Sequence, residues 1–152
     1  PEHLTLWCED EPIVIAGDPI ISSISPNLGV YATEPEADPI QEWLMSCEAF
    51  LPFSNDKQLV LPGHKLPFYG LPHRLKQLIE NHHSALKRLV AFLKEPQTAV
   101  DCFPVLFNRK ISDNEYGLAL VEAVAHLNHL YRKKIVKREL NSKGAYVYTL
   151  KN

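Results

Sequence analysis

The sequence predicts an α/β half-lobe followed by a winged-helix domain, and three observations support this. The apolar run at 12–17 ends in Gly17 and is followed by Asp18, and the run at 58–61 is followed by Pro-Gly-His, and both patterns predict buried strands that end abruptly beside a polar side chain. Each run has an amphipathic helical pattern after it. The last third of the chain has the order helix, helix, hairpin, which is typical of a winged helix.

Residues 3–8 alternate in polarity and predict a strand, and a polar turn at 9–11 joins it to the second strand at 12–17. We expect these two strands to form a hairpin. After Asp18, about twenty residues show little periodicity. Loops this long inside a compact domain are usually functional or disordered, and the position of this one beside a candidate site favours function.

A helix is predicted from Asp38, which is suited to the N-cap, with Pro39 at the first helical position. Its apolar residues recur at spacings of three and four, and the helix should end before Pro52. A strand at 58–61, a loop at 62–72 and a second amphipathic helix at 73–94 come after it.

Beyond Pro96 we expect a short helix at 98–107, a connector, a long helix at 114–133 and two strands at 135–140 and 145–150. An Asn-Ser-Lys-Gly turn joins these strands as a hairpin. Residues 1–95 carry a net charge of −6 and residues 96–152 one of +4. The predicted domains are therefore 1–95, including the linker helix, and 96–152.

Composition indicates a soluble globular protein, with 45% hydrophobic and 22% charged residues. No apolar run is long enough for a membrane span. Cys8, Cys47 and Cys102 are odd in number and far apart, which favours buried thiols in a reducing cytoplasm over disulfides or a thiolate zinc site. Because the chain enters a strand almost at once, we expect a fragment.

Asp18 and His64 are the candidate site residues. Each follows a predicted strand, and parallel strands place functional groups together at their carboxyl ends, so the pair would form half of a metal site. Asp18 has an equal alternative role as a turn cap, and His64 alone would be an exposed turn residue. Phe68 and Tyr69 either line a substrate pocket or pack within the proline-rich loop.

Together these motifs resemble the C-terminal portion of a metallo-β-lactamase-superfamily hydrolase of the lactamase-beta-2-like branch. The resemblance is carried by Ile-Ala-Gly-Asp at 15–18, the long loop after it, Leu-Pro-Gly-His at 61–64 and the helix leading to a small winged-helix module. Residues 1–4 also resemble the segment just after a ligand histidine in that superfamily.

The resemblance implies the C-terminal half of an αββα sandwich. It matches Asp18 to the carboxylate that bridges two divalent metal ions, typically zinc, and His64 to the last ligand of the second metal. A complete enzyme would use metal-activated hydroxide to attack a small-molecule thioester, lactone, amide or phosphodiester.

Departures from the family pattern limit this implication. The His-x-His-x-Asp-His motif is absent, His3 matches a histidine that is not a ligand, and Pro19 stands where the family often has a polar residue. Two ligands do not hold a catalytic metal. We therefore expect the isolated chain to be inactive, and to pair with a missing N-terminal half or with a second copy.

The other histidines are interpreted as structural. His82 and His83 are adjacent on a helix and point about 100° apart, so one should be packed and one solvated. His126 and His129 lie on one helix face at a workable metal spacing, but no third ligand is evident and a core or surface role is favoured.

A nucleic-acid or protein-binding winged helix is the alternative function. Basic residues cluster at the end of the long helix and in the hairpin, as contacts to phosphates would require: Arg132, Lys133, Lys134, Lys137, Arg138 and Lys143. The helix in the recognition position argues against it, because residues 116–126 are nearly all apolar and contain no Arg, Lys, Asn or Gln to read a base edge.

Overall fold

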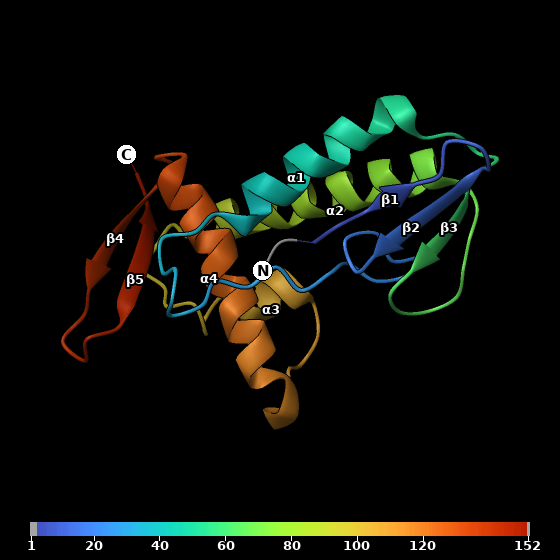
Figure 1. The fold of residues 1–152 in the computed structure, drawn as a ribbon. Helices are drawn as coiled ribbons and strands as arrows, with labels where there is room; N and C mark the ends of the chain where they lie inside the picture. The colour runs from blue at the N-terminus through green and yellow to red at the C-terminus, as the bar shows by residue number, and fades with distance from the viewer. Residues whose placement is uncertain (1–2, 152) are drawn as a thin grey trace. The chain divides into compact units, whose positions relative to one another are not determined.

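The structure is a computed structural model that describes residues 3–151 (Figure 1). The chain divides into two compact units. Unit 1 contains residues up to Pro26 together with 43–81, and unit 2 contains residues 27–42 together with 82–152. Each unit combines two separate segments, whereas the predicted domains 1–95 and 96–152 are continuous; that domain division stays a prediction.

Unit 1 contains a three-stranded sheet of order β1-β2-β3. Strand β1 (Leu6–Trp7) pairs antiparallel with β2 (Ile13–Gly17), which confirms the predicted hairpin, although β1 is shorter than the run at 3–8. Strand β3 (Leu59–Pro62) pairs in parallel with β2, and Val14 lies opposite Val60. This parallel pairing brings the carboxyl ends of β2 and β3 to the same edge.

The two faces of this sheet differ in exposure. Val14, Ala16 and Val60 are fully buried, while Leu6 and Ile15, which are paired across β1 and β2, are 52% and 50% exposed. Side chains of a strand alternate between faces, so one face belongs to the core and the other is open in the described part of the chain.

Helix α1 (Pro39–Phe50) begins where the sequence predicts, because Asp38 Oδ1 accepts a 3.0 Å hydrogen bond from the Gln41 amide. A short 3₁₀ turn, η1 (Leu51–Phe53), follows it. Helix α2 (Leu71–Phe92) starts two residues earlier than predicted. Its apolar stripe is buried, including Leu75, Leu78 and Leu89.

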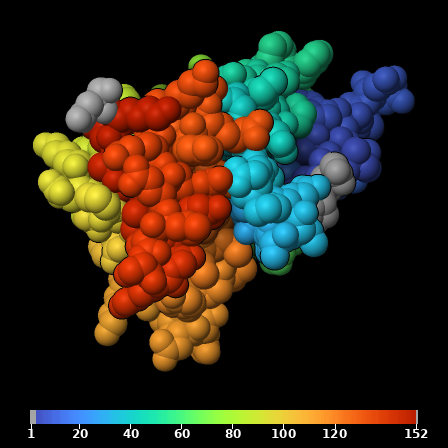
Figure 2. All heavy atoms as spheres, turned by 90° about the vertical axis from the view of Figure 1, so that its left-hand side faces the viewer, coloured from blue at the N-terminus to red at the C-terminus, as the bar shows by residue number. Residues whose placement is uncertain are grey.

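In unit 2, helix α3 (Phe103–Phe107), the turn η2 (Asp113–Glu115) and helix α4 (Tyr116–Arg132) precede the hairpin of β4 (Val136–Leu140) and β5 (Tyr146–Leu150). Figure 2 shows the hairpin in red beside the orange helix α4. The hairpin is confirmed, and its turn is closed by Asn141 Oδ1, which accepts hydrogen bonds from the amides of Lys143 and Ala145.

Helix α3 is shorter than the predicted helix at 98–107. The Asp101 carboxylate accepts hydrogen bonds from the amide and hydroxyl of Thr98, which hold residues 98–101 in a turn. A side chain that bonds to nearby backbone competes with helix formation in this way. The helix therefore begins only at Phe103.

The cysteines differ from one another. Cys47 and Cys102 are buried as predicted, and burial raises the pKa of each thiol to about 12. The prediction is wrong for Cys8, which is exposed because it follows the last residue of β1 at the start of the turn. No helix within residues 3–151 is long and apolar enough to cross a lipid bilayer.

Candidate functional site

Asp18 and His64 come together just beyond the ends of β2 and β3. Gly17 adopts a left-handed conformation (φ +58°), and its carbonyl accepts a 2.9 Å hydrogen bond from the Gly63 amide. This backbone bond joins the two strand ends immediately before the two side chains. The structure thus places the pair side by side, as the strand-end argument expects.

Gly63 is required for this close approach. A Cβ atom added at position 63 would overlap Asp18 Oδ1, at a separation shorter than real Cβ contacts show. The Asp18 carboxylate therefore occupies the space that any other residue at position 63 would fill. The sequence shows a Pro-Gly-His turn but not this reason for the glycine.

The two side chains are hydrogen-bonded to each other. His64 Nδ1 lies 2.6 Å from Asp18 Oδ1, and the side chains are 69% and 39% exposed, respectively. With the carboxylate ionised, Nδ1–H donates and Nε2 keeps its lone pair. The pair can therefore orient an imidazole whose Nε2 can accept a proton or donate its lone pair to a metal ion.

These residues alone do not fit a catalytic metal site. Two ligand atoms at about 2.0–2.1 Å from a tetrahedral ion lie roughly 3.3 Å apart, whereas these two atoms are at hydrogen-bond distance. Among residues 3–151 there is also no group of three or more His, Cys, Asp or Glu side chains that could hold a metal ion. Asp18 Oδ2 and His64 Nε2 supply two ligand atoms at most, and no reaction step can be assigned to this chain alone.

Phe68 and Tyr69 follow His64 in the loop before α2. The amide and carbonyl of Phe68 exchange hydrogen bonds with Val60 of β3, at 3.1 and 2.8 Å, and the Tyr69 side chain is 64% exposed. The backbone of Phe68 therefore forms a single antiparallel bridge to β3, outside the three-stranded sheet. The suggestion that these two aromatic side chains line a substrate pocket stays a prediction.

The remaining histidines are in the core or at its surface. His82 is buried and His83 is exposed, as expected. His126 is buried, its ring stacks on that of His82 at 5.7 Å, and its Nδ1–H donates to the Glu122 carbonyl at 2.9 Å. Burial lowers the pKa of His126 to about 4, so this imidazole is neutral at pH 7.

His129 has a partner that sequence reasoning missed. Its Nδ1 lies 3.0 Å from Asp38 Oδ1, and both side chains are buried. Asp38 thus caps α1 and also binds an imidazole of α4, ninety-one residues later in the chain. Only the capping role has a local sequence signal.

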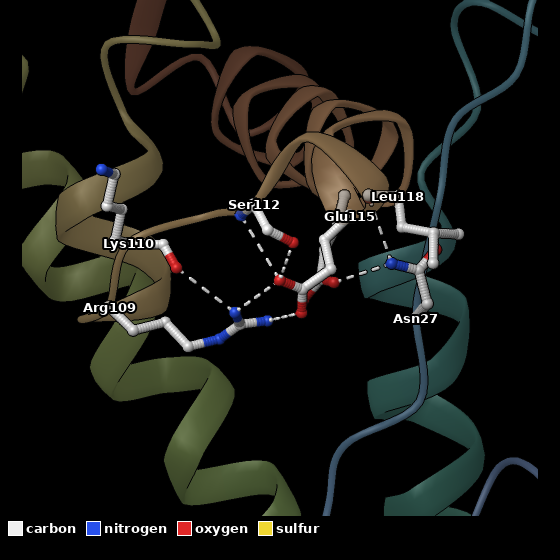
Figure 3. A network of polar contacts seen from close by, with 7 residues as sticks. Asn27, Arg109, Lys110, Ser112, Glu115 and Leu118 are labelled. Carbon is white, nitrogen blue, oxygen red and sulfur yellow. Dashed lines mark hydrogen bonds and ion pairs between the residues drawn. The ribbon is translucent and has the colours of Figure 1, made fainter.

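A polar network surrounds the start of α4 (Figure 3). Arg109 forms a bidentate pair with Glu115, at 2.6 and 3.0 Å, which together with Ser112 lowers the pKa of Glu115 to about 2. Asn27 donates to the Leu118 carbonyl and to Glu122 Oε2, at 3.2 and 2.9 Å. Burial nevertheless raises the pKa of Glu122 to about 7.

Half of the basic cluster is engaged within the chain. Arg132 donates to the Glu36 carbonyl at 3.0 Å, and Lys137 pairs with Glu139 at 3.1 Å. Arg138 lies over the rings of Tyr131 and Tyr146, at 4.5 and 4.3 Å, and its guanidinium pairs with Glu36 at 2.9 Å. The Arg138 contacts hold the hairpin, and all three basic side chains are engaged within the chain, which weakens the case for a phosphate-binding surface.

Comparisons with known proteins extend these observations. Residues 86–151 match the model of a family described as the metallo-beta-lactamase-like, C-terminal domain. No match to the chain is found among curated proteins.

Two solved structures illustrate the likeness of the whole chain. The crystal structure of a beta-lactamase domain protein from Burkholderia ambifaria has a TM-score of 0.94 and 33% identity over 99% of this chain and 44% of its own. That of a metallo-beta-lactamase family protein from Thermus thermophilus has a TM-score of 0.83 and 28% identity over 98% of this chain and 45% of its own. The chain spans less than half the length of either relative. It has the mixed α/β fold of these proteins.

Proposed function

We propose that this chain is the C-terminal portion of a dinuclear metal-dependent hydrolase and is catalytically inactive by itself. The observation that carries the proposal is the contact of Asp18 and His64 at neighbouring strand ends. The names of the similar structures, a beta-lactamase domain protein and a metallo-beta-lactamase family protein, support a hydrolase, and their lengths support a longer parent protein.

In the longer parent protein, Asp18 would bridge two divalent ions and His64 would bind one of them. The family resemblance suggests zinc for these ions. The metal ions would supply hydroxide for attack on a thioester, a lactone or amide, or a phosphodiester. Within this chain, Gly63 leaves room for the carboxylate, and the strand ends fix the two ligands relative to each other. The other ligands would come from outside residues 1–152.

The open sheet face supports a proposal about partners. Leu6 and Ile15 expose large apolar side chains on one face, and β1 is a two-residue edge strand. Such surfaces are usually covered in a complete protein. We propose that the N-terminal part of the parent covers this face, and that a second copy of the chain covers it when that part is absent.

We also propose a winged-helix arrangement for residues 96–152, because α3, α4 and the β4–β5 hairpin follow the order of that motif. The apolar character of residues 116–126 favours a covering or dimer-forming role for it over base recognition. A cytoplasmic location is proposed from the free cysteines.

The test is metal analysis and hydrolase assay of the full-length parent, using thioester, lactone, amide and phosphodiester substrates. We expect about two divalent ions per chain and turnover of one substrate class. Asp18→Asn and His64→Gln should each reduce the metal content and the turnover. A parent that contains no metal and hydrolyses none of the substrates would contradict the proposal. Turnover by the 152-residue chain alone would contradict its inactivity, and salt-sensitive binding of duplex DNA would favour the nucleic-acid alternative.

A further inference from the structure

The segment that follows Asp18 is held by side chains from the parts of α1 and α2 that belong to unit 1. Residues 19–26 form neither helix nor strand, so their backbone carbonyls lack the partners that regular structure provides. Trp43 of α1 donates its indole N–H to the Pro19 carbonyl at 3.1 Å. The carbonyls of Ile21 and Ile24 are bound by one residue of α2, Arg74.

Burying the charged side chain of Arg74 beside this segment costs desolvation free energy. It is 7% exposed, its Nε donates to Ile21 at 2.7 Å and its Nη2 to Ile24 at 2.9 Å, while Nη1 donates to the side-chain amide oxygen of Gln77. Burial lowers the pKa of Arg74. A buried cation is normally paired with a carboxylate, whereas these three acceptors are neutral amide oxygens. The guanidinium reaches two carbonyls three residues apart with two different nitrogens held in a fixed plane, whereas all the donors of an ammonium lie on one nitrogen at the end of a flexible stem.

The position of this segment gives the arrangement a consequence for the site. On the N-terminal side of Asp18, Gly17 is bonded to Gly63. On the C-terminal side, the carbonyl of the very next residue is bound by Trp43, and two later ones are bound by Arg74. The backbone of Asp18 is therefore fixed from both directions. Its carboxylate must be fixed, because it lies in the space left by Gly63 and contacts His64.

We propose that Arg74 is a positioning residue for Asp18, which holds the 19–24 segment so that the carboxylate meets His64 and, in the parent hydrolase, the metal ion. The part of this inference that concerns the metal ion rests on the proposed function. The effect on the Asp18–His64 contact stands without any metal.

The chain offers a matched control on the same helix. Arg88 of α2 also donates to backbone carbonyls, those of Val105 and Leu106 in unit 2, at 3.1 and 3.4 Å. Arg88→Gln removes arginine–carbonyl hydrogen bonds without touching the segment after Asp18. Any general cost of losing such bonds therefore appears in both variants.

The experiment compares Arg74→Gln, Arg74→Lys and Arg88→Gln in the full-length protein. The imidazole ¹⁵N signals of His64, assigned with His64→Gln, report its hydrogen bond to Asp18 in the metal-free protein. Retention of metal against a chelator reports the complete site. Thermal unfolding measures the loss of stability in each variant.

We expect both Arg74 variants to shift the His64 signals and to weaken metal retention by on the order of tenfold. Arg88→Gln should lower the unfolding temperature while leaving both site readouts unchanged. If Arg74→Gln does not fold, Arg74→Lys and Trp43→Phe test the proposal in its place, because each loses contacts to the segment after Asp18. Both variants should shift the His64 signals in the same direction as each other.

The proposal is overturned if folded Arg74 variants leave the His64 signals as in the unaltered protein, or if Arg88→Gln shifts them equally. It is also overturned if Arg74→Lys keeps the His64 signals and the metal retention of the unaltered protein. The positive charge at position 74, and not the geometry of the guanidinium, would then position Asp18. A full-length protein without metal would defeat the proposed function, while the His64 signals would still decide the role of Arg74.

Discussion

At the scale of single residues, the spacing between Gly63 and Asp18 controls whether a carboxylate and an imidazole can meet. A Cβ at position 63 would overlap Asp18 Oδ1, so the site leaves no room for a methyl group. Burial also acts on two titratable residues of α4: it raises the pKa of Glu122 and lowers the pKa of His126. As pH rises, the first shift lowers the stability of the fold and the second raises it.

Gly63→Ala should push the Asp18 carboxylate away and break its 2.6 Å contact with His64. We expect a loss of about 1–3 kcal/mol in stability from overpacking, together with altered His64 imidazole signals in NMR. The control is Gly117→Ala in α4, where the added Cβ meets no atom within 4 Å and should stabilise the helix by about 0.5–1 kcal/mol. Unchanged His64 signals in Gly63→Ala would refute the steric argument.

The stability of Glu122→Gln relative to that of the unaltered chain should be greater at pH 8 than at pH 5. The folded pKa of about 7 exceeds the ordinary value of 4.5, so between these pH values the folded state binds more protons at Glu122 than the unfolded state does. The contribution of Glu122 is therefore present below about pH 4.5 and is lost as pH rises through 7, by roughly 3 kcal/mol at most. Urea unfolding at both pH values measures the difference.

His126 provides an internal check on this pH dependence. Its folded pKa of about 4 lies below the ordinary value of 6.5, so its contribution to stability rises between pH 4 and 6.5. Removing the opposing slope of Glu122 should leave a steeper rise with pH in Glu122→Gln. A variant whose pH profile parallels that of the unaltered chain would show that Glu122 titrates normally.

At the scale of secondary-structure elements, side chains from distant segments decide how helix ends and the hairpin are held. Asp38 caps α1 and binds His129 of α4, and Asn128 donates to the carbonyls of Pro35 and Ala37. Figure 2 shows this light-blue segment beside α4. The hairpin is held similarly by Arg138.

Asp38→Ala should cost roughly 2 kcal/mol or more, because it removes the cap of α1 and leaves the buried His129 without its carboxylate partner. Asp38→Asn keeps an oxygen for the cap and should cost less. Chemical denaturation of both variants measures the difference. Equal losses would mean that the cap of α1 adds nothing beyond the contact of the Asp38 carboxylate with His129.

Arg138→Lys should destabilise the hairpin by about 1–2 kcal/mol, since an ammonium does not stack between Tyr131 and Tyr146 as a guanidinium does. Lys137→Ala, which removes an exposed pair with Glu139, should change stability by less than about 0.5 kcal/mol. Amide hydrogen exchange of β4 and β5 locates the effect. An Arg138→Lys hairpin that exchanges no faster would assign the stacking no structural role.

At the scale of the whole molecule, the open face of the unit 1 sheet determines how the 152-residue chain behaves alone. We expect this chain to self-associate, because Leu6 and Ile15 present apolar surface that water does not favour. Light scattering over a range of concentrations should show dimers or larger species, and Ile15→Thr should shift them toward monomer. A clean monomer at all concentrations would contradict the proposed role of this face.

The sequence by itself determined the elements whose signals are local. Apolar runs followed by glycine located β2 and β3, the Asp-Pro cap located α1, and the Asn-containing turn located the β4–β5 hairpin. It also predicted that Asp18 and His64 would meet, because the pairing of parallel strands follows from simple rules of topology. Their roles as metal ligands stay a prediction.

Only the tertiary structure decided which partners the polar side chains bind. The Arg74 contacts to Ile21 and Ile24, the His129 contact to Asp38 and the space at Gly63 join residues forty-five to ninety-one positions apart. Such contacts leave no periodic signal, since a buried carbonyl or carboxylate accepts whichever donor the packing brings within reach. The exposure of Cys8 depends on where β1 ends, and the late start of α3 depends on the Thr98–Asp101 hydrogen bonds that compete with the helix; residue type alone reveals neither.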